Sequence, residues 1–508
     1  MSIRRLITLG AATASLAASL AACSAGSTAT QLGRPDGGDG DRLVVGTVGP
    51  PASLDFTTTG GAAIPQALMG NVYETLVRID ADGEVVPHLA TSWEVSPDGL
   101  VHTFHLREGV TFTNGDAFTA HTAAWSIEQV RTAWTNGLKS RMAPVAATRV
   151  LDDHTLEVTL STPSNRWLWS MGTTTGAMMT PAGVDKRASE PIGTGPYVLD
   201  HFAVGESISF APNPDYWGGA VQEGAAIRYF SDAIGSVNAL RSGDVDVVWS
   251  LQAPELLDTL PEEYSVQVGT TNGEVVLSMN NDAAPFDDPR VRRAVAHGID
   301  REAINRVVWE GLATDTGGAP VPPSDPWFTG RDYYPFDPGK ARALLAEAGY
   351  SPDNRPRVEL TVPSLPYAES AAELLYSQLR DLGFDVTLTT AEFPAVWLAD
   401  VMGAKDYQMS LISHVEPRDV PALFGDPDYY LGFDDARVRE ELRLADVTPG
   451  PAAQRSHMIA AVDGIMADAG ALTLVNAPNI VLTAPGVTGV DADIVVDSLP
   501  LAPIRKED

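Results

Sequence analysis

The residue types that catalyse reactions occur in this 508-residue chain without the spacing that catalysis requires. There is no HExxH zinc motif, no GxSxG nucleophile elbow and no phosphate-binding GxxxxGKS/T loop. Acid pairs such as Asp287-Asp288 and Asp434-Asp435 are expected in a chain with 66 acidic residues, so they do not indicate glycosidase carboxylates. The sequence favours a binding protein over an enzyme, and a secreted hydrolase stays open as the alternative.

The single cysteine, Cys23, lies where its thiol can be modified. Arg4 and Arg5 precede an uncharged run of small and apolar residues from 6 to 22, which is the layout of an export signal. The run ends in LAAC, which resembles the lipobox of bacterial lipoproteins. That resemblance implies cleavage before Cys23 and a thioether-linked lipid on it. The paired arginines leave Sec and twin-arginine export both open.

We therefore expect residues 1–22 to be a signal peptide and residues 23–42, which are small, polar and rich in glycine, to be a flexible tether. Each buried methylene of an acyl chain contributes about 0.8 kcal/mol, so two or three chains would hold the protein on a membrane. No second apolar stretch of about 20 residues occurs. The expected location is the extracellular face of the bacterial cell membrane.

Composition excludes one class of partner and one kind of stabilisation. The formal charge is −32, from 34 basic and 66 acidic residues, and such a surface repels nucleic acid. A chain with one cysteine forms no intramolecular disulfide, so its cores must stabilise it. Removing residues 1–22 from 508 leaves 486, enough for two or three units with apolar cores.

The local patterns predict a mixture of strands and helices, and hence an α/β fold. A β-branched run at 43–49 predicts a strand, and the segment 101–160 reads as short strands around a helix at 120–134. We expect further helices at 65–78, 289–310, 338–348, 368–382 and 454–469, and strands at 385–390 and 407–412. Asp337 is the predicted N-cap of the helix at 338–348.

Seven phrases resemble, in order, those of the family 5 extracellular solute-binding proteins, the group that contains oligopeptide-, dipeptide- and nickel-binding proteins of ABC importers. They are NVYETLV (71–77), VPHLATSWEVSPDGLVHTFHLREGVTFTNGDAFTAHT (86–122), PIGTGPY (191–197), NPDYWGG (213–219), ALRSGDVDV (239–247), PFDDPRVRRAVAHGID (285–300) and FDPGKARALLAEAGY (336–350). The phrases extend over nearly the whole chain after the export signal.

The resemblance implies a two-lobed periplasmic-binding-protein-like fold of type II, with an extra subdomain inserted in lobe I and the ligand held in the cleft between the lobes. Lobe I is expected at 43–76, 191–274 and 480–508, the inserted subdomain at 77–190 and lobe II at 275–479. Ligand contact with both lobes would stabilise only the closed arrangement.

Two of these phrases have local interpretations as well. In PIGTGPY, Gly193 and Gly195 free the backbone and Pro196 fixes it, so we interpret them as the hinge where the chain crosses between lobes; an ordinary turn is the alternative. NPDYWGG is interpreted as a turn that packs Tyr216 and Trp217 rather than as a ligand platform.

In peptide-binding relatives, a second-lobe loop containing a tryptophan supplies an aspartate that pairs with the peptide amino terminus. Here Tyr407–Phe424 reads YQMSLISHVEPRDVPALF, without that tryptophan. Its binding candidates are Ser413, His414, Glu416 and Arg418. Glu416 is the hypothetical replacement for the missing anion, and a local surface ion pair between Glu416 and Arg418 is the competing interpretation.

Other expected ligand contacts are Gly61 and Ala62, in a glycine-rich segment that permits close backbone approach, and Trp397 as an aromatic wall, with Trp327 a further candidate. A flexible turn and burial in the core are the respective alternatives. His414 has no neighbouring histidine, so we expect no metal site and no cofactor.

The resemblance implies as partners a peptide or other small-molecule ligand and the permease and ATPase subunits of an ABC importer, with the protein itself a monomer. Oligosaccharides and metal chelates stay open as ligands. A lipoprotein that keeps the fold but acts as a regulator or sensor also stays open.

Overall fold

The computed structural model describes residues 42–221 and 223–507. The predicted signal peptide, nearly all of the predicted tether, and Cys23 lie outside the described residues. Within residues 43–508, which form one unit, runs of apolar and β-branched residues build two large sheets with separate cores.

A mixed seven-stranded sheet is built from both ends and the middle of the chain. Its central strand β1 is buried along its whole length and pairs in parallel with both β10 and β11, as a continuous apolar run predicts. One face packs on a large core and the other on a smaller core that includes helix α4. In spatial order its strands are β12 (Ser265–Gly269), β18 (Asn479–Thr483), β11 (Val247–Val248), β1 (Leu43–Thr47), β10 (Ala225–Tyr229), β9 (Ser207–Pro212) and β8 (Tyr197–Ala203).

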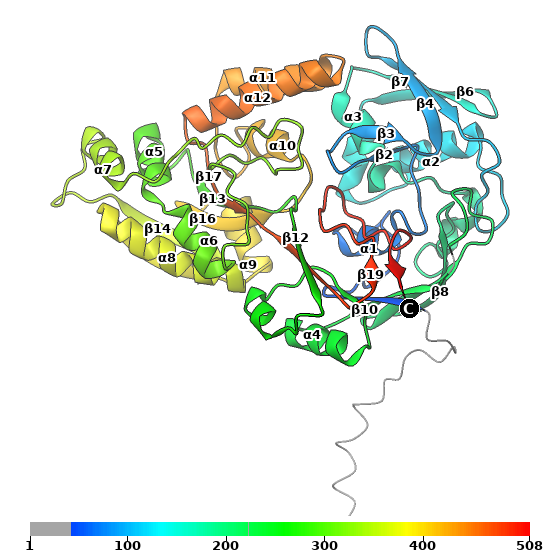
Figure 1. Ribbon diagram of the computed structural model, residues 1–508. Coiled ribbons are helices and arrows are strands. Elements are labelled where there is room, and N and C mark those ends of the chain that lie inside the picture. Colours follow the sequence, from blue (N-terminus) through cyan, green and yellow to red (C-terminus); the bar gives the residue numbers. More distant parts are fainter. Residues whose placement is uncertain (1–41, 222, 508) are drawn as a thin grey trace, which may run out of the picture. The chain divides into compact units, whose positions relative to one another are not determined.

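A mixed five-stranded sheet is built only from residues 274–476. Its strand β13 is fully buried and pairs antiparallel with β16 and β17. Figure 1 shows α5, α6 and α8 beside this sheet, whose apolar side chains form the largest core. In order its strands are β15 (Asp385–Ala391), β14 (Arg357–Pro363), β16 (Met409–His414), β13 (Glu274–Met279) and β17 (Leu472–Asn476).

An antiparallel four-stranded sheet lies in the segment expected as the inserted subdomain. The inward positions of β5 alternate with half-exposed ones, as in a sheet with one covered face. The strands are, in order, β4 (Ala90–Val95), β5 (Val101–Leu106), β7 (Thr155–Leu160) and β6 (Val145–Asp152). Two pairs complete the strands, β2 (Val77–Ile79) with β3 (Val85–Pro87) and β19 (Val487–Thr488) with β20 (Arg505–Lys506).

Helices cover the sheets and join their strands. The α-helices are α1 (Ala63–Leu68), α2 (Ala120–Thr132), α3 (Asn165–Ser170), α4 (Ala233–Ser242), α5 (Pro289–Gly298), α6 (Arg301–Val308), α7 (Pro338–Glu347), α8 (Pro366–Leu382), α9 (Ala395–Trp397), α10 (Val420–Phe424), α11 (Ala436–Val447) and α12 (Pro451–Ala467). Short 3₁₀ helices are η1 (Gly137–Met142), η2 (Thr174–Gly176), η3 (Pro181–Lys186) and η4 (Pro254–Thr259), and η5 (Leu398–Gly403) is a π-helix.

The predictions for two helices were wrong in their extent. The helix expected at 65–78 ends at Leu68, because Met69 is extended and Gly70 adopts a left-handed conformation with φ of 76°. The helix expected at 289–310 is two helices, because Ile299 is extended and Asp300 caps the second one, accepting from Ala303 N at 2.9 Å. The predicted cap Asp337 is confirmed, since it accepts from Lys340 N at 2.8 Å.

The chain passes between the two large sheets at residues 270–273, from β12 to β13, and at residues 477–478, from β17 to β18. The two passages are hydrogen-bonded to each other. Ala477 N donates to Gly273 O at 2.7 Å, and Thr271 Oγ1 donates to Ala477 O at 2.8 Å. Any motion of one large sheet against the other must bend these two segments together.

The hinge prediction for Gly193, Gly195 and Pro196 is therefore wrong. These residues lie before β8, where the chain enters the seven-stranded sheet, and not between the large sheets. A Cβ added to Gly193 would lie 1.8 Å from Val72 O, and one added to Gly195 2.5 Å from Asn71 O. Glycine is needed here for close backbone packing rather than for bending.

Gly193→Ala is expected to lower the free energy of unfolding by about 3 kcal/mol, the upper end for overpacking, because the clash is with a backbone oxygen. Urea denaturation measures the change. Gly137→Ala is the control, since an added Cβ there meets no atom within 4 Å. Unchanged stability in Gly193→Ala, with altered ligand affinity, would instead restore the hinge interpretation.

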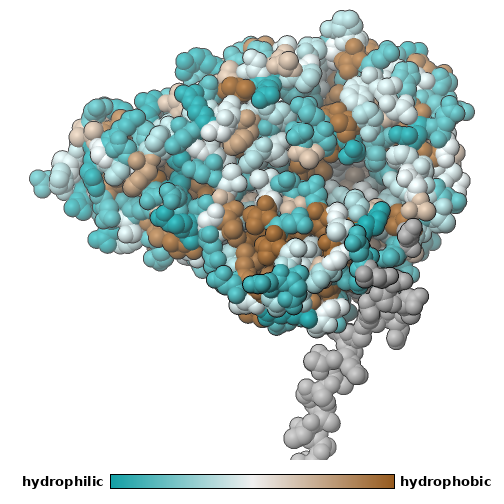
Figure 2. Space-filling model, viewed as in Figure 1, coloured by the Kyte–Doolittle hydropathy of each residue, from teal (hydrophilic) through white to brown (hydrophobic). Residues whose placement is uncertain are grey.

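Polar side chains cover most of the face drawn in Figure 2, with apolar patches between them. In residues 42–221 and 223–507, no helix combines the length and apolar character that crossing a membrane requires.

Candidate ligand-binding site

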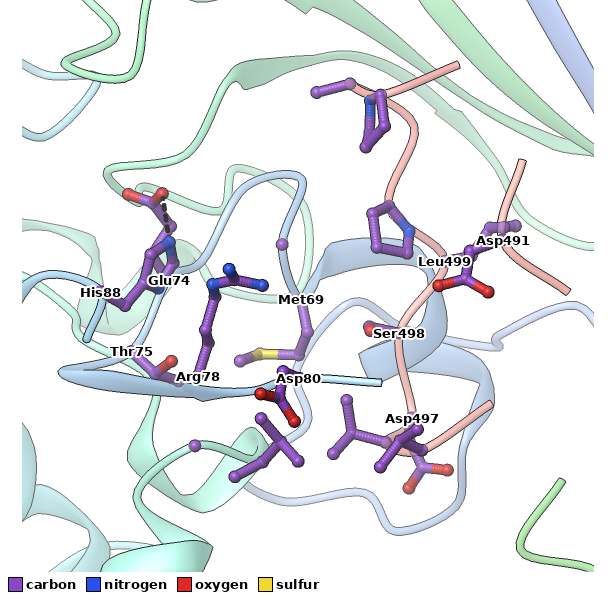
Figure 3. Close-up of a pocket in the computed structure, with 18 of the residues that line it drawn as sticks. Met69, Glu74, Thr75, Arg78, Asp80, His88, Asp491, Asp497, Ser498 and Leu499 are labelled. Atoms are coloured by element: carbon purple, nitrogen blue, oxygen red, sulfur yellow. Dashed lines mark ion pairs between the residues drawn. The ribbon is translucent and has the colours of Figure 1, made fainter. Parts of the chain in front are cut away.

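A cavity of about 540 Å³ opens among three segments that are distant in sequence. Most of its walls come from residues 69–88, 172–174 and 489–504, and Pro196, Tyr216 and Trp249 complete the lining, part of which is drawn in Figure 3. This volume lies within the range of about 300–1,000 Å³ that is typical of small-molecule sites.

The C-terminal wall is fixed to the N-terminal wall by one buried amide. Asn71 Nδ2 donates to Leu499 O at 2.8 Å, and Leu501 N donates to Asn71 Oδ1 at 2.9 Å. Asn71 is fully buried, so both bonds are protected from water. The segment around Asp497 and Ser498 is thereby held against the start of the NVYETLV phrase.

Glu74 joins three of the sequence phrases beneath the cavity. Its Oε2 accepts from Thr194 Oγ1 and from Trp217 Nε1, both at 2.8 Å. Its Oε1 accepts from Tyr216 OH at 3.0 Å and pairs with His88 Nε2 at 3.2 Å, the ion pair dashed in Figure 3. Burial, and then the charge of Glu74, raise the pKa of Tyr216. NPDYWGG thus has a specific polar partner in Glu74, and its Tyr216 also lines the cavity, so the choice between a packing turn and a ligand platform stays open.

Arg78 and Asp497 bring opposite charges to different walls of the cavity (Figure 3). Arg78 is exposed and comes from β2. Asp497 comes from the C-terminal segment, and burial raises its pKa to about 6, a shift that Arg141 opposes and Glu416 reinforces. Asp497 therefore connects the cavity electrostatically with the loop after β16.

In that loop, Arg418 lies between two tryptophans. Its guanidinium carbon is 4.6 Å from the ring centre of Trp169 and 4.7 Å from that of Trp327. Arg418 Nη2 donates to Gly83 O, and Nε lies 3.5 Å from Asp325 Oδ1. Burial raises the pKa of Asp325 to about 6, although Arg418 opposes the shift.

The ion pair between Glu416 and Arg418, the competing interpretation for this loop, is therefore wrong. Arg418 pairs with Asp325, because its side chain turns inward between the tryptophans. Glu416 is 76% exposed and pairs with Arg141 Nη2 at 3.5 Å. Its carboxylate faces a cation from a segment that precedes it by 275 residues.

His414 and Asp419 form a second buried polar group in the same loop after β16. His414 Nε2 lies 2.8 Å from Tyr430 OH, and its Nδ1 lies 3.8 Å from Asp419 Oδ2. Burial lowers the pKa of His414 to about 4 and raises the pKa of Asp419 well above its usual value. Glu274 is buried nearby and accepts from Asn476 Nδ2 at 2.8 Å; burial raises its pKa as well.

The predicted contact residues do not line the cavity. Gly61 and Ala62 are exposed before α1, and Ser413 N donates to Tyr367 OH at 2.9 Å. Trp397 is 1% exposed and donates from Nε1 to Ser410 Oγ at 3.1 Å, inside the core of the five-stranded sheet. The Trp397 ring is therefore not exposed to a ligand site. The Trp327 ring stacks on the guanidinium of Arg418.

Sequence reasoning missed Arg78 and Asp497. Arg78 is one charged residue in the alternating run VRID, and Asp497 is one of many acids, so neither type nor spacing marks them. Across the part of the chain that the structure describes, no three His, Cys, Asp or Glu side chains are grouped so as to hold a metal ion.

Comparison with known proteins yields one family and a consistent set of structures. The model for "Bacterial extracellular solute-binding proteins, family 5 Middle" matches residues 84–431. The glutathione-binding protein GsiB of Escherichia coli K12 is 28% identical over 338 residues. That alignment spans 65% of this chain and 65% of GsiB.

Solved structures match over most of the chain. NikA from Brucella suis, in complex with Fe(III)-EDTA, has a TM-score of 0.80 and 23% identity over 91% of this chain and 100% of its own. DppA from Helicobacter pylori, in complex with the peptide STSA, has a TM-score of 0.73 and 24% identity over 92% of this chain and 98% of its own. These likenesses confirm the expected α/β fold of the type II periplasmic binding proteins.

Proposed function

Because the chain belongs to family 5 of the bacterial extracellular solute-binding proteins, we propose that it captures a small ligand, a peptide in the first instance, and delivers it to the permease and ATPase of an ABC importer. The observation that carries the proposal is the pair of hydrogen-bonded passages that join two separately built large sheets, which is the arrangement that capture of a ligand between two lobes requires. The cavity of about 540 Å³ has no lining residue from the five-stranded sheet, so it is a second concave site beside that one. The peptide-bound DppA structure and the glutathione-binding relative support peptides as the ligand class.

We propose that the two large sheets belong to two different lobes. We assign residues 43–76, 191–274 and 480–508 to lobe I, 77–190 to the inserted subdomain and 275–479 to lobe II. The paired passages at 270–273 and 477–478 replace Gly193–Pro196 as the hinge. A ligand touching both lobes would then stabilise the closed arrangement and present it to the importer.

Glu416, Ser413 and His414 keep a proposed role at the edge of the ligand site. Glu416 is exposed and its carboxylate has one cation nearby, Arg141, which a ligand ammonium group can replace. The exposed backbone of Gly61 and Ala62 is the proposed contact from the other side. Arg418 and Trp397 are excluded from direct contact by their burial.

Membership in an extracellular family places the protein outside the cytoplasm. We further propose that it is a lipoprotein anchored through Cys23, that it works as a monomer and that it catalyses no reaction. The LAAC sequence supports the lipid anchor, and the absence of the catalytic motifs named above supports a binding role without catalysis.

A thermal-shift screen of the refolded full chain in detergent tests the binding function. The panel contains di- to tetrapeptides, glutathione, oligosaccharides and nickel–histidine complexes. Ligand at a hundredfold excess over its Kd is expected to add about 2.7 kcal/mol of stability and to raise the unfolding midpoint. A response confined to sugars or nickel complexes would reject the peptide, and no response to any solute would reject the binding function.

A further inference from the structure

We propose that the start of α3 and the end of α11 form a polar clasp that holds lobe II against the inserted subdomain and that must open before a ligand enters or leaves. The inference rests on the proposed function, because it assigns a part in the closing of the two lobes to residues of the inserted subdomain. Asn165 and Asp446 are the positioning residues of this clasp.

The end of α11 is capped by a side chain from a distant part of the sequence. The last carbonyl groups of a helix have no amide donors within it. Asn165 Nδ2, from the first turn of α3, donates to Ala445 O at 2.8 Å and to Thr448 O at 2.7 Å. One amide group of the inserted subdomain therefore satisfies two carbonyl groups in the segment assigned to lobe II.

The start of α3 is capped in return by α11. Asp446 Oδ1 accepts from Ser164 Oγ and from Arg166 N, both at 2.9 Å. Ser164 is the N-cap of α3, since its Oγ also accepts from Trp167 N at 3.1 Å. Each helix end thus supplies the hydrogen-bond partners that the other end lacks, which fixes how the two ends meet.

The clasp and the proposed hinge lie in different places. Figure 1 shows α3 beside α11 at the top of the view, above β12, from which the chain enters the first passage between the large sheets. Gly99, in the turn between β4 and β5, lies against Pro449, because an added Cβ would be 3.0 Å from Pro449 Cγ. The two lobes are therefore joined at a second point, in addition to the paired passages at 270–273 and 477–478.

The junction is polar, and no shared apolar core makes it permanent. Among the described residues, no apolar cluster combines side chains of 77–190 with side chains of 275–479. Groups that are hydrogen-bonded to each other can exchange these bonds for bonds to water at a small net cost. Polar interfaces of this kind between parts of one chain allow relative motion.

Opening the clasp would also withdraw Arg418, which forms another contact between the same two parts. Arg418 donates to Gly83 O and stacks on Trp169, both in the segment assigned to the inserted subdomain. Trp169 lies one turn after Asn165 on α3. The short helix α3 thus carries both contacts, and separation of the lobes should break them together.

Hydrogen exchange of the refolded full chain without ligand, followed by mass spectrometry, tests the proposal. Asn165→Ala removes both hydrogen bonds to the end of α11, and Asp446→Ala removes both hydrogen bonds to the start of α3. Exchange in each variant should be roughly tenfold faster at 80–85 and 415–423, the segments around Gly83 and Arg418, as well as at the two helix ends. Unchanged exchange in β1 shows that a variant is folded.

Three control variants separate the clasp from the stability of its helices. Asp446→Asn should exchange more slowly than Asp446→Ala, because its amide oxygen still accepts a hydrogen bond. Arg166→Ala should exchange as the unmodified protein does, since the Arg166 side chain is 57% exposed and its backbone N–H remains. Asp435→Ala removes the N-cap at the opposite end of α11 and should leave exchange at 80–85 unchanged.

Faster exchange that is confined to the ends of α3 and α11 would overturn the proposal, because it would limit these residues to capping. So would an equal increase at 80–85 in Asp435→Ala. If a solute of the thermal-shift panel binds, both alanine variants should bind it roughly tenfold more weakly, because less of the protein is closed; equal affinity would also overturn the proposal. If no solute binds, the binding function fails, while hydrogen exchange still decides whether the clasp holds the two parts together.

Discussion

Replacing Arg418 with alanine is expected to lower the free energy of unfolding by about 3–5 kcal/mol at pH 8, because it leaves the buried Asp325 carboxylate without its cation. The Arg418 side chain is 9% exposed and that of Asp325 is 5% exposed, so water does not replace the lost partner. Equilibrium urea denaturation measures the change.

Stacking adds to the electrostatic loss. The guanidinium lies between the faces of Trp169 and Trp327, and a desolvated cation–π contact contributes up to about 2 kcal/mol. Trp169 belongs to α3, in the segment that we assign to the inserted subdomain, whereas Trp327 lies in the segment that we assign to lobe II. Removing Arg418 therefore also weakens the contact between these two parts of the chain.

The destabilisation should depend on pH with a definite sign. The folded-state pKa of Asp325, about 6, is above its unfolded value of 3.8, so the folded protein holds this proton more tightly. Its contribution to stability falls as the pH rises from about 4 to about 6. Without Arg418, the folded-state pKa of Asp325 rises further, so the Arg418→Ala variant continues to lose stability above pH 6. The difference in the free energy of unfolding between the unmodified protein and the variant should therefore grow above pH 6.

A double-mutant cycle separates the ion pair from the packing. Arg418→Ala in an Asp325→Asn background should cost less than in the unmodified protein, because no charge is stranded. Arg437→Ala is the surface control, since Arg437 is 84% exposed and its pair with Asp435 should contribute little. Equal losses in both backgrounds would show that the stacking alone stabilises this contact.

The sequence predicts the fold well because its phrases are local and follow a known order. Strand runs and capping residues act over a few positions, and Asp337 could be identified as an N-cap from its neighbours alone. Failures arise where one residue type serves two purposes. Gly193 reads as a flexible point, yet its missing Cβ serves close packing against Val72 O, a contact that the sequence does not reveal.

The site was harder to predict because the partner of each charged side chain depends on the fold and not on its neighbours in sequence. Glu416 and Arg418 are two positions apart and look like a pair, but the chain folds them toward different partners, Arg141 and Asp325. Arg78 and Asp497 are separated by more than 400 residues, and only the fold brings both of them to the walls of one cavity. Long-range pairing of this kind leaves no local pattern.

Glu74 is the second residue where such long-range pairing has a large expected effect on stability. Its carboxylate accepts from side chains 120, 142 and 143 positions away, in PIGTGPY and NPDYWGG. The sequence shows these phrases as separate turns. The structure shows that they are attached to NVYETLV through one buried anion, which explains why their polar and aromatic residues occur together.

Glu74→Ala is expected to lower the free energy of unfolding by about 3–5 kcal/mol, because it leaves the donors of Thr194, Tyr216 and Trp217 without an acceptor. Glu74→Gln should lower the free energy of unfolding by less, because the amide oxygen still accepts a hydrogen bond. Some loss should remain, because the amide NH₂ group faces another donor. Urea denaturation followed by tryptophan fluorescence measures both. Glu94→Ala, at an exposed position of β4, is the control. If the Glu74→Ala and Glu74→Gln variants are equally stable, the charge of Glu74, rather than its geometry as an acceptor, stabilises the contacts with Thr194, Tyr216 and Trp217.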